Sequence, residues 1–281
     1  MDISIIIVSW KVKEKLRANL TALSLALAGL KAEVLVVDNN SQDGTVDMIQ
    51  SEFPEVKLIV NRDNLGFAKA NNQGIKEASG DFILLLNPDM RVFPETIKAM
   101  LAWARLHPQA VVSGCRLETE TGALVPHVRR FPRLTDQLAV ILKLPHLFPH
   151  LLDAYLQADF DYQQAAKVDS IRGAFFLINC QVWEKIAGSA KPLLDERYFI
   201  WFEEVDFCRQ VYQYGGEVWY TPAARCIDYV GQSFGQVNLR LKQKYVQESM
   251  LKYFQKWQPR WQSRFLRGAW FLGNLIVKIF A

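Results

Sequence analysis

An acidic residue that directly follows a buried strand is the first candidate for chemistry in this sequence. Phe82 to Leu86 is an unbroken apolar run of strand length, as expected for a strand covered on both faces in a parallel sheet. Asn87-Pro88-Asp89 follows at once, and open α/β sheets bind ligands just beyond the carboxyl ends of their strands. Asp89 is therefore a candidate for holding a metal ion or a phosphate. Taken alone, the tripeptide is better explained as an ordinary turn.

A second group of acids lies in the last third of the chain. Glu203, Glu204 and Asp206 follow the aromatic run Tyr198 to Phe202 and open a segment with helical character. The helix dipole favours acids in a first turn, and this explanation is sufficient for the three residues taken alone. A carboxylate can also take a proton from a reacting hydroxyl. On a helix, Glu203 and Asp206 share a face while Glu204 points elsewhere, so we do not expect these acids to be interchangeable.

Length and composition place the chain among globular proteins. Its 281 residues, half of them hydrophobic, can bury a substantial core. A formal net charge of +4 with dispersed basic residues does not indicate nucleic-acid binding. Four widely spaced cysteines without a C-x-x-C pair indicate neither a disulfide framework nor a structural zinc site, which fits a reducing cytoplasm. The apolar run after Met1-Asp2 lacks the flanks of a signal peptide, so we expect a strand there.

Strand and helix patterns alternate through the first half, as in a doubly wound sheet. The strand-like runs are Ile3–Val8, Glu33–Val37, Val56–Val60, Phe82–Leu86 and Val111–Leu117. The helical patterns are Lys13–Leu30, Phe67–Ala78 and Pro94–Leu106, and the polar loop Asp38–Thr45 suits the cap of a further helix. In the second half, Ile171–Ile178 is expected to be a strand that leads into an Asn179-capped helix through Ile186.

Four separate blocks, in matching order and spacing, resemble the family 2 glycosyltransferases. The blocks are Ile5–Trp10, Val36–Thr45, Asn64–Gly74 and Leu86–Asp89. They are most similar to the bacterial rhamnosyltransferase-like branch, which transfers a sugar from a nucleotide diphosphate with inversion, and the resemblance extends from Ile3 to Ser233. It implies a GT-A fold, an α/β architecture with a Rossmann-like, mostly parallel central sheet flanked by helices. The helical patterns beyond the resemblance predict a C-terminal helical extension.

The resemblance also implies a division of the chain. Residues 1–234 would form the GT-A domain, with 1–117 as the nucleotide-sugar-binding half and 118–234 as the acceptor and catalytic half. Residues 235–281 would form the helical extension.

The nucleotide site implied by the resemblance lies in the first half. Ser9 and Trp10 would line the pocket, and Asp38 would accept a hydrogen bond from the ring N–H of uracil or thymine, which cytosine lacks. Taken alone, Asp38 is better explained as a helix-capping or loop acid. The Asn64-Leu65-Gly66 turn would present backbone amides to the diphosphate. Lys69 is either a charge partner there or an exposed lysine of an ordinary helix.

Further donor-site residues follow from the same blocks. Asn40, Asn72 and Asn87 fall within them and are expected near the donor. Gly173-Ala174 resembles the family segment that approaches the donor sugar, where the absence of bulk lets the backbone come close.

A divalent cation, Mg²⁺ or Mn²⁺, is implied as cofactor. Asn87-Pro88-Asp89 stands at the family's D-x-D position with Asn in place of the first Asp, so Asp89 would be the main metal ligand. Residues 224–233 resemble a His-x-x-Gly-x-Ser block in which Asp228 takes the place of His. Asp228 is thus either a replacement oxygen ligand or the mark of a rearranged site.

The base is implied by the segment 194–209, which resembles the family's acceptor-site motif, often Glu-Asp-x-Asp. Glu204 stands for the second acid and is the expected general base, with Glu203 in reserve. The implied partners are a UDP- or dTDP-linked sugar, with dTDP-rhamnose as one candidate, and a saccharide or lipid-linked acceptor in cell-surface polysaccharide synthesis. The alternatives are a sugar nucleotidyltransferase and a catalytically impaired nucleotide-sugar-binding protein. The first strand is not followed by G-x-G-x-x-G, so an NAD enzyme is not indicated.

Two segments of the second half raise the question of membrane contact. Leu138–Leu156 is apolar but is cut by Pro145 and Pro149, so it cannot be a straight membrane span, and we expect an inserted or mobile segment beside the acceptor site. Its neighbouring histidines lack metal-ligand spacing and are expected to be ordinary loop residues: His127, His146 and His150.

The C-terminal residues 236–258 and 259–281 are expected to form two helices, the second opened by Pro259. One face of the second helix carries Trp261, Phe265, Gly268 and Leu272, beside a basic face of Arg260, Arg264 and Arg267. Gly268 to Ala281 would span roughly 21 Å, short of the about 30 Å hydrocarbon core. The alternatives are attachment to the cytoplasmic face of the membrane and packing on the catalytic domain.

Overall fold

The computed structural model describes residues 1–229, 235 and 237–280, with side chains up to Phe271. Gly231 and Ser233 of the expected His-x-x-Gly-x-Ser block lie outside the described residues, as does the side chain of Leu272.

The first half forms four parallel strands in the spatial order β3-β2-β1-β4. The strands are β1 (Ile3–Ser9), β2 (Ala32–Asp38), β3 (Lys57–Val60) and β4 (Phe82–Leu86), joined by α1 (Lys13–Ala26), α2 (Thr45–Glu52) and α3 (Phe67–Glu77). The predicted alternation of strands and helices is confirmed, although α1 ends before Leu30. β4 is buried at every position, because its neighbours β1 and β10 and helices on both faces cover it.

Strands of the second half extend the same sheet, in the order β4-β10-β6-β11-β5. They are β5 (Met90–Val92), β6 (Ala110–Glu118), β10 (Phe175–Asn179) and β11 (Glu217–Asp228), with the short β8 (Ala166–Lys167) on β11. β10 runs antiparallel to both neighbours, so the sheet is mixed in this half. Sequence reasoning missed β5, which has only three residues, and β11, whose register shifts between Thr221 and Arg225.

The predicted strand Ile171–Ile178 is wrong as a single element. It divides into β9 (Ser170–Ile171), which pairs with β7 (Val128–Arg129), and β10 in the main sheet. Between them the backbone serves other partners: the Arg172 amide donates to the His127 carbonyl at 3.1 Å, and the Ala174 carbonyl accepts from the Asn87 amide at 2.9 Å. The break places residues 172–174 beside the end of β4.

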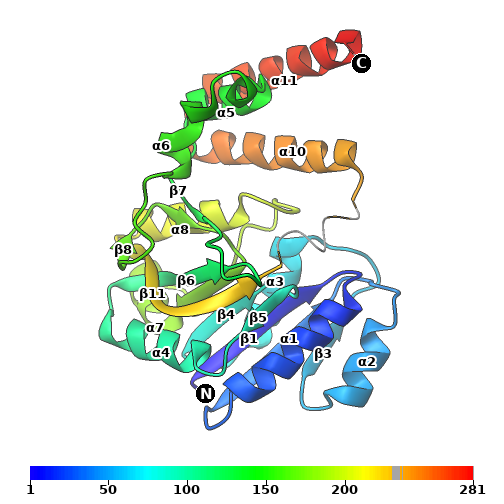
Figure 1. Cartoon of the computed structure of the whole chain (residues 1–281), viewed down its shortest axis with the longest axis vertical. Coiled ribbons are helices and arrows are strands. Elements are labelled where there is room, and N and C mark those ends of the chain that lie inside the picture. The colour runs from blue at the N-terminus through cyan, green and yellow to red at the C-terminus, as the bar shows by residue number, and fades with distance from the viewer. Residues whose placement is uncertain (230–234, 236, 281) are drawn as a thin grey trace.

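Helices cover both faces of the sheet (Figure 1). α1, α2 and α4 (Thr96–Leu106) pack on one face through a cluster that includes Ile5, Leu20 and Ile97. α3, α7 (Cys180–Ala187) and α8 (Glu203–Gln213) pack on the other. This arrangement is the flanked α/β sheet expected from the sequence.

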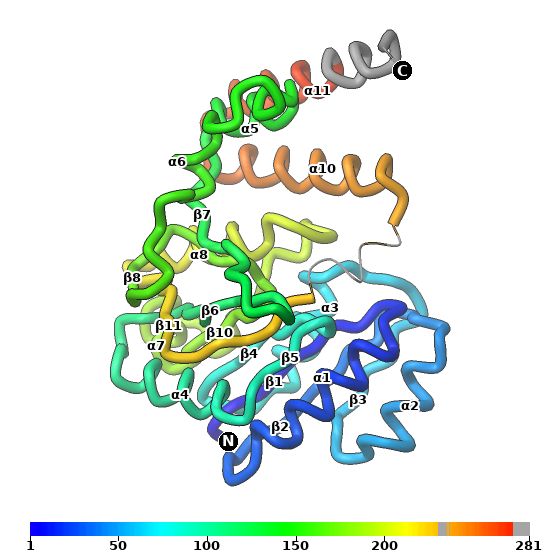
Figure 2. Tube along the Cα trace, in the orientation of Figure 1, coloured from blue at the N-terminus to red at the C-terminus, as the bar shows by residue number. Residues whose placement is uncertain are grey.

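A third layer lies beyond α8, formed by α10 (Leu239–Trp257), α11 (Arg260–Phe280) and α5 (Leu134–Ile141) (Figures 1 and 2). It has its own apolar cluster, which includes Ile141, Tyr253 and Leu266. The segment after α5 is not a simple loop but a run of short helices: η1 (Leu144–His146), η2 (Pro149–Leu152) and α6 (Asp153–Leu156). The two predicted C-terminal helices are confirmed, and none of the helices, within the residues described, is long and apolar enough to cross a membrane.

Candidate active site

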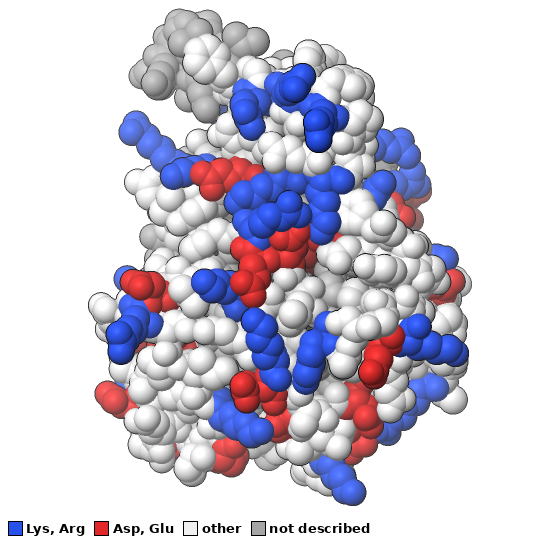
Figure 3. Space-filling view, turned by 180° about the vertical axis from the view of Figure 1, so that it is seen from behind, with Lys and Arg blue, Asp and Glu red and all other residues white. Residues whose placement is uncertain are grey.

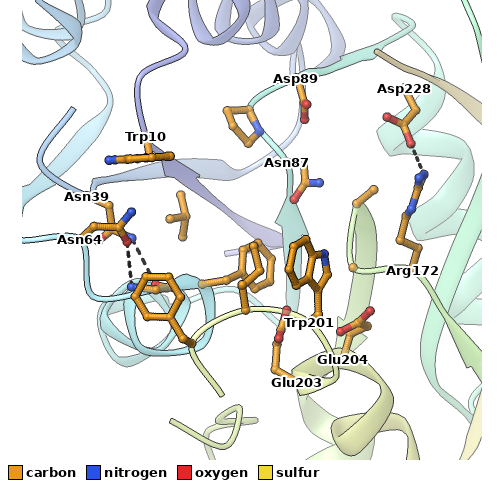
Figure 4. Close-up of a pocket in the computed structure, with 18 residues that line it drawn as sticks. Trp10, Asn39, Asn64, Asn87, Asp89, Arg172, Trp201, Glu203, Glu204 and Asp228 are labelled. Carbon is orange, nitrogen blue, oxygen red and sulfur yellow. Dashed lines mark hydrogen bonds and ion pairs between the residues drawn. The ribbon is translucent and has the colours of Figure 1, made fainter. Parts of the chain in front are cut away.

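A cavity of about 260 Å³ opens at the carboxyl ends of β1 and β4, between two walls of different origin (Figure 4). We call the first the strand-end wall, because its residues directly follow β1, β2 and β4: Trp10, Asn39, Asn87 and Asp89. The second, the loop wall, consists of the segments 172–174 and 199–204, in which every residue except Phe202 lines the cavity. The lining is completed by Val8, Asn64, Gly66, Phe67, Pro88 and Asp228. Nine of the predicted site residues line this cavity, although the first and last of them, Trp10 and Asp228, lie far apart in the sequence.

Asp89 and Asp228 are brought together at one end of the cavity. Asp228 is the last residue of β11 and pairs with Met90 of β5, so it lies across from the residue next to Asp89. The Asp89 carbonyl accepts a hydrogen bond from the Tyr229 amide at 3.2 Å. Both side chains line the cavity although each residue is largely buried. The antiparallel pairing of β5 with β11, two strands missed from the sequence, places Asp89 and Asp228 in the same cavity.

Arg172 holds Asp228 from the loop wall. Its Nη1 lies 2.7 Å from Asp228 Oδ2, in a pair whose carboxylate is almost fully buried (Figure 4). A buried carboxylate of this kind requires a charged partner, and the guanidinium supplies it. The sequence did not single out Arg172, because residues 171–178 were expected to form one continuous strand, whereas the chain leaves the sheet at Arg172.

The donor set of this corner suits a hard cation. Carboxylate oxygens are preferred ligands of Mg²⁺ and Mn²⁺, which usually complete their coordination with water and phosphate oxygens. Asp89 can serve as such a ligand, whereas one oxygen of Asp228 already bonds Arg172. In the described part of the chain, no three His, Cys, Asp or Glu side chains form a metal-binding group. The residues therefore fit a cation shared with a bound diphosphate.

Ser9 and Asp38 sit side by side just behind the cavity lining. They pair across β1 and β2, and both are buried. Asp38 Oδ2 accepts from the Ser41 amide at 3.0 Å, while Asp38 Oδ1 and Ser9 Oγ have no hydrogen-bond partner among the described residues. Buried oxygens without partners are costly, so this spot favours an additional donor.

Besides Ser9 and Asp38, three further expected donor-site residues do not line the cavity. The Asn40 side chain accepts a hydrogen bond from Gln42, and Lys69 is exposed on α3. Asn72 instead bonds the backbone of Leu194 in both directions, at 2.8 Å each. Asn72 thus fixes the segment around Leu194 onto α3.

The turn before α3 docks against the loop wall. The Gly66 amide bonds Asn64 Oδ1 at 2.9 Å, and the Phe67 amide bonds the Phe199 carbonyl at 2.6 Å. These two amides are therefore engaged within the protein. Of the predicted turn Asn64-Leu65-Gly66, only the Gly66 amide is concerned, and the approach of this turn to a diphosphate stays a prediction. Gly66 has a φ of 83°, and a Cβ there would collide with the Phe199 carbonyl, so glycine is required for the loop wall to dock.

Glu203 and Glu204 enter the loop wall at the start of α8 (Figure 4). Glu203 is only 4% exposed, whereas Glu204 is partly accessible. One oxygen of each, Oε2, is buried without a hydrogen-bond partner among the described residues. Burial raises the pKa of both carboxyl groups above the ordinary glutamate range, and the charge of Glu204 raises the pKa of Glu203 further. Arg172 acts in the opposite direction on the pKa of Glu204.

Glu204 also borders a second cavity of about 260 Å³, on the side toward α10. Glu204, Trp201 and Arg172 line both cavities, whereas Glu203 lines only the first. The expected difference between the two glutamates therefore appears as a difference in access. Asp206, the third acid, faces away and bonds Tyr198, Gln210, Lys256 and Trp257.

A family model described as glycosyl transferase family 2 matches residues 4–154, more than half of the chain. The chain belongs to glycosyl transferase family 2. The N-acetylglucosaminyl-diphospho-decaprenol L-rhamnosyltransferase of Mycobacterium tuberculosis is 28% identical over 227 residues, which cover 76% of this chain and 72% of that protein. The resemblance found in the sequence is confirmed.

Solved glycosyltransferases share the fold of this family 2 chain. S. aureus TarS 1–349, in complex with UDP, aligns over 91% of this chain and 72% of its own with a TM-score of 0.57 and 16% identity. The mannosyltransferase PcManGT from Pyrobaculum calidifontis, in complex with GDP-Man and Mn²⁺, covers 96% of this chain and 69% of its own with a TM-score of 0.57 and 15% identity. The fold is GT-A. The family identifies the chain as a glycosyltransferase that uses a nucleotide sugar. Neither alternative, the sugar nucleotidyltransferase or the catalytically impaired nucleotide-sugar-binding protein, is favoured by these matches.

Other residues of this family 2 site were not found from the sequence. Asn39 lines the cavity, and its side-chain amide donates to the Gly66 carbonyl at 3.2 Å. Trp201 and Phe202 have φ angles of 63° and 70°, which bulky residues seldom adopt, and such conformations concentrate at functional sites. Only the unusual density of aromatics in residues 198–202 could have drawn attention to them.

Proposed function

We propose that this glycosyltransferase inverts the anomeric centre, moving a hexose such as rhamnose from a UDP- or dTDP-linked donor to a saccharide or lipid-linked acceptor in cell-surface polysaccharide synthesis. The observation that carries the proposal is the position of Glu204 between two cavities. In a single displacement, the donor sugar and the acceptor hydroxyl bind on different sides of the general base, and the hydroxyl must lie within hydrogen-bond reach of that base. The rhamnosyltransferase relative supports the choice of sugar and of acceptor class.

Glu204 is the general base of this reaction. The acceptor hydroxyl oxygen forms the new bond to the anomeric carbon, its proton passes to the Glu204 carboxylate, and the bond to the diphosphate breaks with its electron pair on the leaving oxygen. The raised pKa of Glu204 brings the base closer to neutral pH, where proton transfer is most effective. Glu203, buried behind it, keeps the role of reserve candidate.

The strand-end wall binds the donor. Trp10 flanks the nucleotide, and the unpartnered oxygens of Asp38 and Ser9 receive the donor N–H of the base. Asp89 would hold Mg²⁺ or Mn²⁺, and the cation would supply neutralisation of the charge on the diphosphate. Arg172 and Asp228 close the same corner. The Mn²⁺ in the PcManGT complex supports a divalent metal in this fold.

A panel of nucleotide sugars tests the donor proposal, with release of nucleoside diphosphate as the measurement. A UDP- or dTDP-sugar should be consumed only with Mg²⁺ or Mn²⁺. Asp89→Ala should lower the rate roughly tenfold or more, because the metal contributes several kcal/mol to charge stabilisation. Asp63→Ala, an exposed acid outside the cavity, is the matched control. Release of pyrophosphate instead of nucleoside diphosphate would contradict transfer, and equal rates with and without metal would contradict the role of Asp89.

The third layer attaches the enzyme to the membrane surface. Trp261 and Phe265 are 58% and 55% exposed, because α11 packs through the opposite face, which carries Leu266. Packing and surface attachment thus involve different faces of α11, and the exposed aromatic face is the one available to a membrane. Arg260, Arg264 and Arg267 are exposed beside them, and Figure 3 shows basic side chains gathered over the end of the molecule that α10 and α11 form. Aromatic and cationic side chains together suit an anionic lipid surface at the cytoplasmic face.

A further inference from the structure

The second cavity has one wall that is built like a binding face. Arg129 belongs to β7 and Ser170 to β9, while His127 directly precedes β7 and Arg172 directly follows β9. Arg129 pairs with Ser170, and the Arg172 amide bonds the His127 carbonyl. Since alternate residues of a strand share a face, these four side chains project from the same side of the ribbon. All four line the cavity.

Arg129 brings a positive charge that has no carboxylate partner. Its guanidinium donates to the carbonyls of Val128, at 2.7 Å, and Pro126, at 3.4 Å. Within the residues that the structure describes, no acid forms an ion pair with it. Arg129 is half-buried, and burial lowers the pKa of its guanidinium. A partly desolvated guanidinium with unused donors favours an anion, and phosphate matches its planar geometry.

Arg172 adds a second guanidinium to the same wall, toward the first cavity. It is paired with Asp228 there and also lines the second cavity. The two arginines therefore flank the cavity with only one acid, Glu204, among its lining residues. Because Asp228 already pairs with Arg172, the charge left to attract an anion in this space is that of Arg129.

His127 supplies an acceptor for a neutral donor group. Its Nδ1 lies 3.1 Å from the Val125 carbonyl, so Nδ1 carries the proton and Nε2 is the acceptor. Nε2 has no hydrogen-bond partner among the described residues although His127 is 2% exposed. Burial, with the nearby Arg172 and Arg129, lowers the pKa of His127 to about 4, so the ring is neutral at physiological pH. A hydroxyl group satisfies such a nitrogen, whereas an anion does not.

The opposite wall is apolar and aromatic. Trp201, Phe202 and Val205 face the ribbon, and Val246 of α10 closes the space. Aromatic faces pack against the C–H face of a sugar ring while polar groups bond its hydroxyls. The cavity thus combines guanidinium donors, a hydroxyl acceptor, an aromatic surface and the proposed base.

We propose that this cavity binds the acceptor as a sugar whose phosphate or diphosphate group bonds Arg129 and Arg172, while its ring lies against Trp201 within reach of Glu204. This proposal rests on the proposed function, because it names the acceptor class of the same enzyme. Two sources carry the shared chemistry: a lipid-linked saccharide diphosphate and a soluble sugar phosphate. Arg129 and Arg172 make the phosphate a requirement for tight binding rather than a tolerated substituent.

Binding to enzyme already saturated with UDP and Mg²⁺ tests the proposal, because the nucleotide occupies the first cavity. The probes are N-acetylglucosamine, N-acetylglucosamine 1-phosphate and octyl N-acetylglucosaminyl diphosphate, measured by calorimetry or ligand-observed NMR. Either phosphorylated probe should bind at least tenfold more tightly than the free sugar, as expected for charged hydrogen bonds. Preference for the soluble phosphate or for the octyl compound identifies the source.

Arg129→Ala should abolish the difference between phosphorylated and free sugar, while UDP binding stays unchanged and shows that the variant is folded. Arg130→Ala removes an exposed neighbouring arginine outside the cavity and should preserve the difference. Equal binding of all three probes, or equal effects of the two substitutions, would overturn the proposal. Failure of UDP to bind the native enzyme would count against the proposed function instead. The two failures can be told apart because the three acceptor probes are compared by their binding, which requires no sugar transfer.

Discussion

The two walls of the active site are held in place by different means. In the strand-end wall, Trp10 and Asn87 lie within one residue of strands that the sheet fixes on both sides. In the loop wall, the segment 199–202 follows no strand, and its backbone is fixed by distant partners. The Phe199 carbonyl accepts from Phe67, and the Ile200 carbonyl accepts from Ser249 Oγ at 2.8 Å.

The support for the loop wall comes largely from α10. Phe199 stacks on Tyr245 with ring centroids 4.5 Å apart. Behind the wall, the fully buried Asp206 bonds Lys256 Nζ at 2.7 Å and Trp257 Nε1 at 2.6 Å. Because Asp206 lies in the first turn of α8, these bonds fix the helix that carries Glu203 and Glu204. The comparison teaches that the donor side depends on the sheet, whereas the base depends on the C-terminal helices.

The largest expected effect separates the two walls by function. Glu204→Gln keeps the size of the side chain but cannot accept a proton, so the transfer rate should fall by roughly 10²–10⁴-fold. Binding of the nucleoside diphosphate, a property of the strand-end wall, should remain nearly unchanged. In the native enzyme, transfer should rise with pH above the ordinary glutamate range, because the raised pKa of Glu204 delays loss of its proton. Steady-state kinetics and calorimetry measure the two quantities.

Glu203→Gln is the matched control for this prediction, since it changes the neighbouring acid that lines only the first cavity. It should affect transfer far less than Glu204→Gln. A native rate in Glu204→Gln together with a loss in Glu203→Gln would assign the base one residue earlier in the chain.

The next effect tests whether α10 supports the base. Lys256→Met leaves the carboxylate of Asp206 buried without its cation, so the free energy of unfolding should fall by roughly 3 kcal/mol. Transfer should weaken more than nucleotide binding, because the loop wall loosens first. Lys244→Met, at an exposed position of the same helix, should change the stability by less than about 0.5 kcal/mol. Chemical denaturation of both variants measures the difference in the free energy of unfolding. Equal values for the two variants would contradict the proposal that α10 supports the helix that carries the general base.

The smallest effect concerns the outer side of the third layer, which neither wall uses. Replacing both exposed aromatics, Trp261→Ser with Phe265→Ser, should lower recovery with vesicles containing phosphatidylglycerol by roughly tenfold. Soluble transfer should be unaffected. Leu106→Ser is the control, because Leu106 is a similarly exposed apolar residue at the end of α4. Liposome flotation is the measurement, and equal recovery of the three proteins would exclude this face as the attachment surface.

The sequence by itself determined the elements whose burial pattern is continuous. β1, β2 and β4 are apolar runs of strand length, and the polar residues that follow them had to meet at one edge of a parallel sheet. Trp10, Asn87 and Asp89 were predictable on that ground. Pro259 likewise marked the start of α11. In each case the signal lies within a few neighbouring residues.

Only the tertiary structure decided which distant residues share the site. Arg172 was concealed within an apolar run, and its role arises because the chain leaves β9, bonds His127 and reaches Asp228, 56 residues further on. Asn72 looked like a donor-site residue but bonds Leu194, 122 residues later. Local patterns specify strands and helices because those depend on neighbouring residues, whereas the partner of a charged or amide side chain depends on which segments the folded core places beside it.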